Sequence, residues 1–254
     1  MSSPLRPPLF DRRRLQHSFG RAAAGYSEVA VLQREAESRL LEQLEVLEDT
    51  VPGRILDVGS GPGRASGVMK GRWPKAEVVA LDIALPMLGQ VPKHTRFWRP
   101  VRRVCGEAAM LPFADASFDL IFSNLCLQWV PELPVALAEF RRVLRPEGLL
   151  LFSTFGPDTL KELRAAFAEV DRGPHVSRFI DMHDIGDGLL ASGFRDPVLE
   201  REDFTLTYAD VRSLMRELRA IGATNADAQR QRSLTGKAHL ARVDAAYERF
   251  RADG

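Results

Sequence analysis

The sequence is poor in cysteine, and the two thiols that it has lie far apart. Cys105 and Cys126 are the only cysteines among 254 residues. They are too few and too widely separated for a disulfide framework or a zinc site. The simpler interpretation is a pair of reduced thiols in a cytoplasmic protein.

The sequence also lacks a net charge of either sign and any long apolar run. It has 35 Lys and Arg against 34 Asp and Glu, a formal net charge of +1. No global field therefore favours nucleic acid or a membrane surface as a partner. No apolar run is long enough to span a bilayer, and the basic N-terminal stretch lacks the apolar core of a secretory signal. We expect a cytoplasmic protein with neither nucleic-acid nor membrane partners.

What the sequence does have is a helical start followed by alternating strands and helices. Residues 10–47 carry a helical pattern that we expect to divide into two helices near Gly25. From residue 53 onward, five short apolar segments alternate with helical ones. Such alternation predicts an α/β domain with a parallel sheet. The segment PVLEREDFTLTY (197–208) alternates as an antiparallel strand does, and residues 237–250 are predicted to be a helix.

A glycine-rich turn follows the first predicted strand in the stretch LDVGSGPGR (56–64). Its spacing is G-x-G-x-G, set by Gly59, Gly61 and Gly63, whereas a dinucleotide site has G-x-G-x-x-G. The preceding Asp57 disfavours a diphosphate and suits an ammonium group such as that of S-adenosylmethionine (SAM). For this motif alone, a structural turn without a ligand stays the alternative.

Further polar residues follow the next predicted strands. Asp82 closes the second strand, where an acid accepts hydrogen bonds from both ribose hydroxyls of NAD or SAM alike. Glu107 and Ala108 follow the third strand, where they would meet an adenine edge. Four residues after or at the end of the fourth strand would face the same cleft: Ser123, Asn124, Leu125 and Gln128.

Taken together, these motifs resemble those of the class I SAM-dependent methyltransferases. They are LDVGSGPG, the pair LD at 81–82, GEAAMLPF (106–113) and FDLIFSN (118–124). The resemblance implies a Rossmann-like sheet of order 3-2-1-4-5-7-6, with strand 7 antiparallel, and SAM as cofactor. Glu107 departs from the family pattern, which usually has aspartate there. The implied cofactor-binding residues are Tyr26, Asp57, Gly59, Gly61, Gly63, Asp82, Ile83, Glu107, Ala108, Asn124 and Gln128.

The flanks are similar to one branch, the methyltransferases that methylate malonyl-acyl carrier protein early in biotin synthesis. The matching stretches are FGRAAAGYSEVAVLQRE (19–35), SNLCLQWV (123–130), FGPDTLKELR (155–164), SRFIDMHDIGDGL (177–189) and LMRELRAIGATNA (214–226). The resemblance implies methyl transfer to the free carboxylate of a malonyl thioester on acyl carrier protein. It also implies a single methyltransferase domain over 1–254, with a helical lid (10–48), a SAM-binding core (53–156) and a substrate-side part (157–254).

This reaction implies no catalytic side chain, because a carboxylate is already ionised at neutral pH and needs no general base. Proximity and alignment would then supply the rate. We expect no metal either. His175 and His183 have no partner acid at a diagnostic spacing and are interpreted as structural.

The resemblance also implies residues on the substrate side. Arg178, in the inserted segment, is the first choice to orient the malonyl carboxylate, with an ordinary solvated arginine as the alternative. Gln33 and Trp129 are assigned to the substrate as well, although Trp129 beside apolar neighbours also suits a core position. For Tyr26, the alternative is an aromatic anchor between two helices.

Acyl carrier protein is acidic, so a basic surface is expected to receive it. The preferred candidate is the N-terminal group of Arg12, Arg13, Arg14 and Arg21. Such groups more often form an ordinary solvated face, which is the alternative. The oligomeric state is left open.

The sequence departs from the resembled family at its end, and rival functions exist. Related sequences continue with a segment that supplies the final antiparallel strand. Here the sequence ends at AAYERFRADG (245–254), so we expect that strand to be absent and stability to be reduced. QWVPELPVALAEF (128–140) also resembles the mitochondrial complex I assembly factor that hydroxylates an arginine. A SAM-binding scaffold and a small-molecule O-methyltransferase are two more candidate functions.

Overall fold

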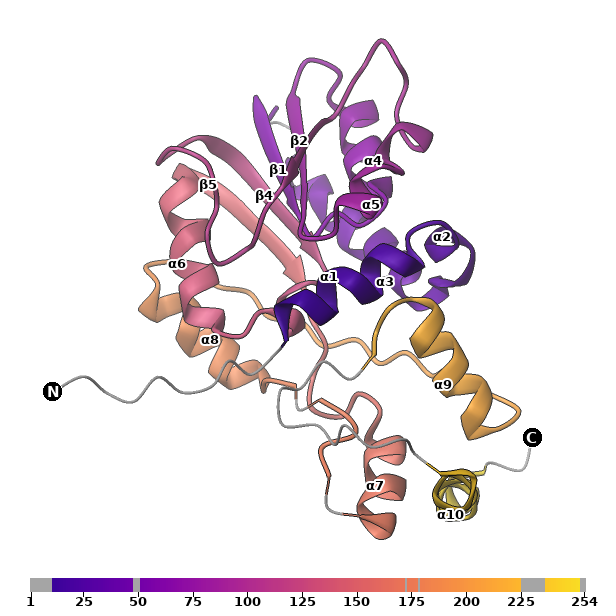
Figure 1. Ribbon diagram of the computed structural model, residues 1–254. Helices are drawn as coiled ribbons and strands as arrows, with labels where there is room; N and C mark the ends of the chain where they lie inside the picture. Colours follow the sequence, from indigo (N-terminus) through magenta and orange to yellow (C-terminus); the bar gives the residue numbers. More distant parts are fainter. Residues whose placement is uncertain (1–10, 48–50, 172, 178, 225–235, 252–254) are drawn as a thin grey trace, which may run out of the picture.

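The centre of the molecule is a sheet of five parallel strands. The computed structural model describes residues 11–47, 51–171, 173–177, 179–224 and 236–251. The strand order is β3-β2-β1-β4-β5, and every neighbouring pair is parallel (Figure 1). This confirms the predicted α/β class and the first five positions of the predicted order. The strands are β1 (Arg54–Val58), β2 (Glu77–Asp82), β3 (Arg102–Cys105), β4 (Phe118–Asn124) and β5 (Leu144–Ser153).

Helices cover both faces of this sheet and extend past one of its ends. The α-helices are α1 (Arg12–Ala22), α2 (Tyr26–Val29), α3 (Val31–Glu42), α4 (Arg64–Arg72), α5 (Leu85–Leu88), α6 (Leu133–Val143), α7 (Lys161–Val170), α8 (Met182–Ala191), α9 (Val211–Ala220) and α10 (Lys237–Tyr247). Short 3-10 helices are η1 (Gln43–Leu47), η2 (Val91–Lys93), η3 (Leu127–Trp129) and η4 (Glu248–Phe250). No helix in the described ranges is long and apolar enough to cross a membrane.

The N-terminal helical region has two breaks where the sequence predicts one. The predicted break near Gly25 separates α1 from α2. A second break falls at Ala30, whose ψ of 59° is not helical, so that α2 and α3 are distinct. The three helices therefore change direction twice, and α3 packs against β4 and β5.

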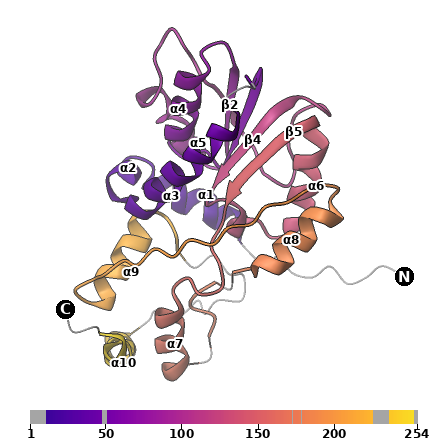
Figure 2. The same ribbon diagram turned by 180° about the vertical axis from the view of Figure 1, so that it is seen from behind.

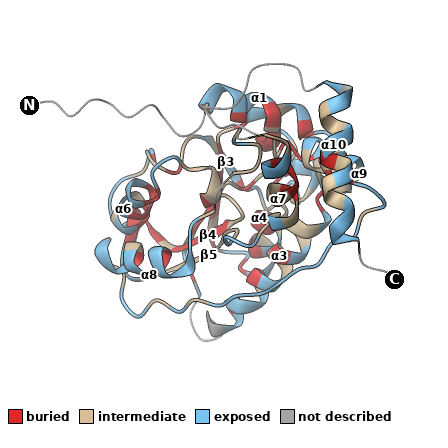
Figure 3. Cartoon of the chain, turned by 90° about the horizontal axis from the view of Figure 1, so that it is seen from below, coloured by how far each residue is buried: buried red, intermediate tan, exposed pale blue. Residues whose placement is uncertain are grey.

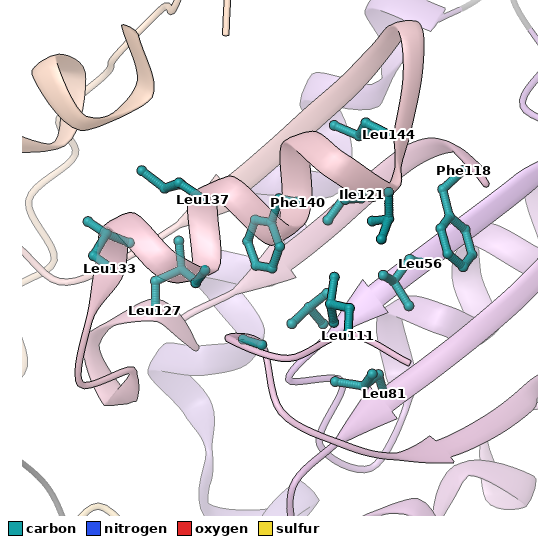
Figure 4. Packing of buried hydrophobic residues seen from close by; sticks show 14 of the residues in the cluster. Leu56, Leu81, Leu111, Phe118, Ile121, Leu127, Leu133, Leu137, Phe140 and Leu144 are labelled. Atoms are coloured by element: carbon teal, nitrogen blue, oxygen red, sulfur yellow. The ribbon is translucent and has the colours of Figure 1, made fainter. Parts of the chain in front are cut away.

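Alternate side chains of the strands enter two separate cores, because successive residues of a strand point to opposite faces. On one face, Leu56 and Ile121 pack against α6 and α8 around the fully buried Phe140 (Figure 4). On the other face, Ile55 packs with Met69 of α4 and with α3. Figure 3 shows buried stretches along α6 where it faces the strands, and exposed stretches along its outer side. The two cores hold the carboxyl ends of the strands in fixed register.

A third, smaller cluster lies beyond the carboxyl ends of the strands and joins α7, α9 and α10. Phe167, Leu214 and Val243 are buried in it. Helices α7 and α10 lie side by side in both views (Figures 1 and 2). Helix α7 begins at Lys161, directly after Leu160, which adopts a left-handed conformation with φ of 56°.

The prediction of an antiparallel strand at 197–208 is wrong. These residues form no strand, and Phe204 and Leu206 are 38% and 42% exposed. In the order 3-2-1-4-5-7-6, the sixth strand pairs only with the seventh. No antiparallel strand occurs in the described part of the chain, so the segment has no ladder in which to bond its backbone groups.

We expect Phe140→Ala to lower the free energy of unfolding by about 3–5 kcal/mol, because it leaves a cavity in the core under α6. Urea denaturation followed by circular dichroism measures this loss. Phe97→Ala is the matched control, since Phe97 is 87% exposed and its loss should be near neutral. Equal destabilisation by the two substitutions would contradict the core assigned to this face.

Candidate cofactor and substrate site

The glycine turn lies at the carboxyl edge of the sheet, where parallel α/β proteins place their ligands. Gly59, Gly61 and Gly63 have φ values of 69°, 53° and 84°, all in the left-handed region. The turn is anchored to the neighbouring strand, since Gly59 N donates to Leu81 O at 2.8 Å. Glycine is required here because side chains are strained at such φ values.

Each glycine of the turn meets a different environment. A Cβ added at Gly59 would overlap Cys126 Sγ, and one at Gly63 would lie 2.7 Å from Val91 Cγ2. A Cβ at Gly61 would meet no atom within 4 Å. Gly59 and Gly63 thus permit close packing behind the turn, whereas Gly61 faces open space.

Asp82 stands at the end of β2, next to the turn. Its Oδ2 accepts from Gly61 N at 2.9 Å, and its Oδ1 accepts from Ala84 N at 2.7 Å. A carboxylate has about four lone-pair sites, so two stay open for further donors. The predicted ribose hydrogen bonds fit this geometry, because Asp82 also lines the cavity described below.

Asp57 lies behind the turn and does not line that cavity. It is 1% exposed and accepts a hydrogen bond of 2.5 Å from Ser66 Oγ on α4. A third acid, Glu37 of α3, approaches the same region and pairs with Arg64 at the start of α4. The prediction that Asp57 lies beside an ammonium group therefore stays a prediction, and any such effect would act through the charge of this buried carboxyl.

The grouping of these acids has a clear electrostatic consequence. Burial raises the pKa of the Asp57 carboxyl to about 7, with further upward contributions from Glu37 and Asp82. Burial likewise raises the pKa of Asp82 to about 6, although its two backbone hydrogen bonds act in the opposite direction. A cation in the cavity relieves this repulsion, whereas a diphosphate increases it. SAM, with an ammonium and a sulfonium group and no phosphate, fits these residues.

The N-terminal helices form one wall of the site and are fixed to the sheet at several points. Asn124 Nδ2 donates to Gln33 O at 3.0 Å, and Arg12 of α1 pairs with Glu107. Ala22 and Ala23 pack with Met87 on α5, just beyond Asp82. Burial first, and then the charges of Asp82 and Glu37, raise the pKa of Tyr26 well above its usual value. The Tyr26 hydroxyl is therefore a neutral hydrogen-bonding group.

The ends of β4 and β5 carry a fixed polar network. Asn124 Oδ1 accepts from Ser153 Oγ at 2.7 Å. Gln128 Nε2 donates to Leu125 O at 2.7 Å, across a turn in which Leu125 has a φ of 46°. Ser153 Oγ also accepts from Leu125 N, at 3.1 Å. These bonds hold uncharged side chains in place at the wall of the cavity.

A continuous cavity of about 2190 Å³ joins these parts. Trp129 lines it and packs edge-to-face on Phe19 of α1, with ring centroids 5.5 Å apart. Gly63, like Asp57, stays outside its lining, and Arg178 lies outside the described residues. Ser123, which the sequence predicts to face the cleft, also lies outside the lining, because it is fully buried and its Oγ donates to Val58 O at 2.9 Å. The remaining sequence-predicted residues of the site line the cavity: Tyr26, Gln33, Gly59, Gly61, Asp82, Ile83, Glu107, Ala108, Asn124, Leu125, Gln128 and Trp129.

Sequence reasoning missed several residues of the site. Glu37 carries no sequence signal, because its place beside Asp57 depends on how α3 folds back onto α4. For Cys126 the sequence indicates only a reduced thiol, yet its sulfur fixes the space behind Gly59, and burial raises its pKa to about 12. Ser153 is the last residue of the fifth strand, and the tendency of ligands to bind at the carboxyl ends of parallel strands would have been enough to predict it.

The prediction that His175 lacks a partner acid is wrong. Its Nε2 lies 2.7 Å from Asp171 Oδ1, four positions earlier in the chain. Helix α7 ends before Asp171, so the contact forms across a loop and not along a helix face. His183, in contrast, is exposed at the start of α8.

Comparison with known proteins adds a consistent set of likenesses. The methyltransferase domain family matches residues 56–152. A malonyl-[acyl-carrier protein] O-methyltransferase of Xylella fastidiosa is 56% identical over 96% of this chain and 82% of its own length. The protein of that name from Halorhodospira halophila is 52% identical over 93% of this chain and 80% of its own length.

Solved structures support the fold. A SAM-dependent methyltransferase of Thermotoga maritima superposes with a TM-score of 0.55 and 22% identity, covering 72% of this chain and 82% of that one. The 1,6-didemethyltoxoflavin-N1-methyltransferase of Burkholderia thailandensis, solved with S-adenosylhomocysteine, has a TM-score of 0.53 and 22% identity, over 76% of this chain and 81% of its own. Both likenesses bear on the fold alone.

Gly59→Ala should weaken SAM binding by about 10- to 100-fold, because strain of about 1–3 kcal/mol arises from the φ of the turn and from Cys126. Titration calorimetry measures the Kd. Gly71→Ala is the control: it lies in α4, its added Cβ would meet nothing within 4 Å, and helix propensity favours alanine there. Unchanged SAM affinity in Gly59→Ala would contradict the assigned role of the turn.

The raised pKa values predict that SAM binding releases protons near pH 6.5. In the free protein the pKa values of Asp57 and Asp82 stand above the ordinary 3.8, so their contribution to stability is present near pH 4 and is lost as the pH rises through 6 and 7. A bound cation favours the ionised acids, so SAM affinity should increase from about pH 5.5 to 7.5.

Calorimetry in two buffers of different ionisation enthalpy counts these protons. Asp57→Asn should release fewer of them at pH 6.5 and flatten the pH dependence. The same release from both proteins would show that Asp57 is not the titrating group.

Proposed function

Because the chain belongs to the family of malonyl-[acyl-carrier protein] O-methyltransferases, we propose that it transfers a methyl group from SAM to the free carboxylate of a malonyl thioester on acyl carrier protein. It is a SAM-dependent methyltransferase. The observation that carries the proposal is that a pocket suited to a cation opens into a cavity far larger than one small molecule needs. Biotin synthesis is the pathway that this reaction would serve.

The acids of the site hold a cation without competing for its methyl group. SAM supplies a methyl group activated by a positively charged sulfur. Asp57 is shielded by the turn and bonded to Ser66, and both oxygens of Asp82 accept backbone N–H groups. The protein's own carboxylates therefore stabilise the charge from fixed positions, and the acceptor carboxylate is left to the substrate.

The acceptor needs positioning and not activation. A malonyl carboxylate is ionised at neutral pH, so no general base has to remove a proton. The side chains at the ends of β4 and β5 are uncharged and locked by hydrogen bonds, as Asn124 and Gln128 show. A rigid wall of this kind aligns the two reactants and keeps water out, which is where the rate would arise. Arg178, by its resemblance to the family motif, is proposed to orient the malonyl carboxylate.

The size and surroundings of the cavity suit a substrate that arrives on a carrier. Sites for small molecules typically measure about 300–1,000 Å³, whereas this cavity measures about 2190 Å³. Part of it is therefore available for the arm that carries the malonyl group. Helix α1 lines it with Arg12, Leu15 and Phe19, while Arg13, Arg14 and Arg21 of the same helix are exposed. The proposed docking residues for the acidic carrier are Arg12, Arg13, Arg14 and Arg21.

The decisive experiment supplies methyl-labelled SAM and malonyl-acyl carrier protein to the purified chain. We expect a base-labile methyl ester on the malonyl group and none on acetyl-acyl carrier protein, which lacks the free carboxylate. With SAM saturating, kcat should change little between about pH 6 and 8, since the nucleophile is already ionised. Asp82→Asn is expected to raise the KM for SAM, because it weakens the ribose and cation contacts.

Three results would point elsewhere. Binding of SAM with no transfer to malonyl-acyl carrier protein would favour a SAM-binding scaffold. Labelling of malonyl-acyl carrier protein and of free small carboxylic acids at equal rates would favour a small-molecule O-methyltransferase. Hydroxylation of an arginine peptide would favour an assembly factor that hydroxylates arginine.

A further inference from the structure

A second cluster of chemically active side chains lies outside the cofactor site, where α7 meets α10. Asp171 follows the last residue of α7, His175 lies in the loop after it, and His239 lies in the first turn of α10. His175 Nε2 is 2.7 Å and 2.8 Å from the two carboxylate oxygens of Asp171. His239 Nε2 is 3.1 Å from Asp171 Oδ2. One atom from each residue thus converges within 4.8 Å of the others.

The surroundings hold these three groups in place. Phe167 stacks on the ring of His175 at a centroid distance of 4.2 Å and an angle of 12°. Gly173 N donates to Asp171 Oδ1 at 2.7 Å, which orients the carboxylate. The side chains of Asp171, His175 and His239 are only 18–19% exposed. Such packing and outer hydrogen bonds are what fix the ligands of a metal site.

The hydrogen bonds within the cluster are incomplete. His175 satisfies the Asp171 carboxylate, but His239 Nε2 is buried and makes no hydrogen bond despite its short distance to that carboxylate. A buried polar atom without a partner is costly, and native structures rarely keep one without a reason. His239 Nε2 therefore lies close to a carboxylate that is already hydrogen-bonded to His175 and to Gly173 N.

We propose that Asp171, His175 and His239 bind a divalent transition-metal ion of the zinc class. Two imidazole nitrogens and one carboxylate oxygen form a donor set that zinc accepts, whereas calcium and magnesium prefer oxygen alone. Bonds of 2.0–2.1 Å at tetrahedral angles place ligand atoms about 3.3 Å apart. The two nitrogen–oxygen distances, 2.7 Å for His175 and 3.1 Å for His239, lie below that value, and all three ligand atoms lie within 4.8 Å of one another. Three protein ligands leave the fourth position to water.

The position of the site indicates a structural role. The ion would join the loop after α7 to the start of α10, across the small core that includes Phe167 and Val243. It would thereby stabilise the cluster formed by α7, α9 and α10, which borders the large cavity through His175. The proposal is independent of the methyl acceptor, and it replaces the expectation from the sequence that no metal is bound.

Chelator-treated protein titrated with ZnCl2, and with CoCl2 as a spectroscopic probe, tests the proposal. The background carries Cys105→Ser, because that exposed thiol is a competing ligand. We expect one equivalent to bind, with tetrahedral cobalt absorption and a raised Tm. His239→Ala should weaken the Kd by at least about 100-fold, beyond the 10- to 100-fold that loss of an outer partner costs.

The matched control is His183→Ala, which removes an exposed histidine and should leave the Kd unchanged. Asp171→Asn keeps the size of the side chain and removes its charge, so it too should weaken metal binding. This second variant tests the site without altering α10. Circular dichroism confirms that each variant is folded. Equal metal affinity in His239→Ala and the parent protein would overturn the proposal. Absence of metal binding by the parent protein would overturn it as well.

Discussion

The structure depends on the burial of carboxylates at the carboxyl ends of two neighbouring strands. Parallel pairing of β1 with β2 sets Asp57 opposite Ala80, two residues before Asp82, and of the two acids only Asp82 lines the cavity. Such an arrangement is unfavourable in an empty protein, as the raised pKa values of both acids show. A cationic ligand at this edge would offset the unfavourable burial of the two acids, and the same charges would disfavour a phosphate.

The N-terminal helices depend on that same acidic region. Glu37 comes from α3 and would add to the repulsion, but Arg64 at the start of α4 pairs with it. The arginine that follows the glycine turn therefore fixes a helix that is distant in sequence. Contacts of Asn124 with the backbone of Gln33, and of Arg12 with Glu107, complete the attachment. The wall of the site is thus held by polar links to several strands, and by apolar contacts such as those of Ala22 with Met87 and of Phe19 with Trp129.

Much of the sheet and its ligand edge could be predicted from sequence, because apolar runs and strand-end residues are local signals. Asp82 and Asn124 are examples, and both line the cavity. The failures have non-local causes. The segment 197–208 has the alternation of a strand but no partner to pair with, and Glu37 and His175 owe their neighbours to the folding of helices onto each other. The sequence places Asp57 correctly at the end of its strand, yet only the structure shows that it lies behind the turn and outside the cavity lining.

The contact between Gly59 and Cys126 has a consequence for how transferable the turn is. The shape of LDVGSGPGR is bounded from behind by a side chain that follows β4, and not by its own residues alone. Glycine at position 59 is therefore required twice, by its left-handed φ and by the space that the Cys126 side chain occupies. The motif is short in the sequence, but the space it occupies is bounded by residues that follow two different strands, β1 and β4. Transplanted into another sheet without the small residue opposite, the same nine letters would not make the same turn.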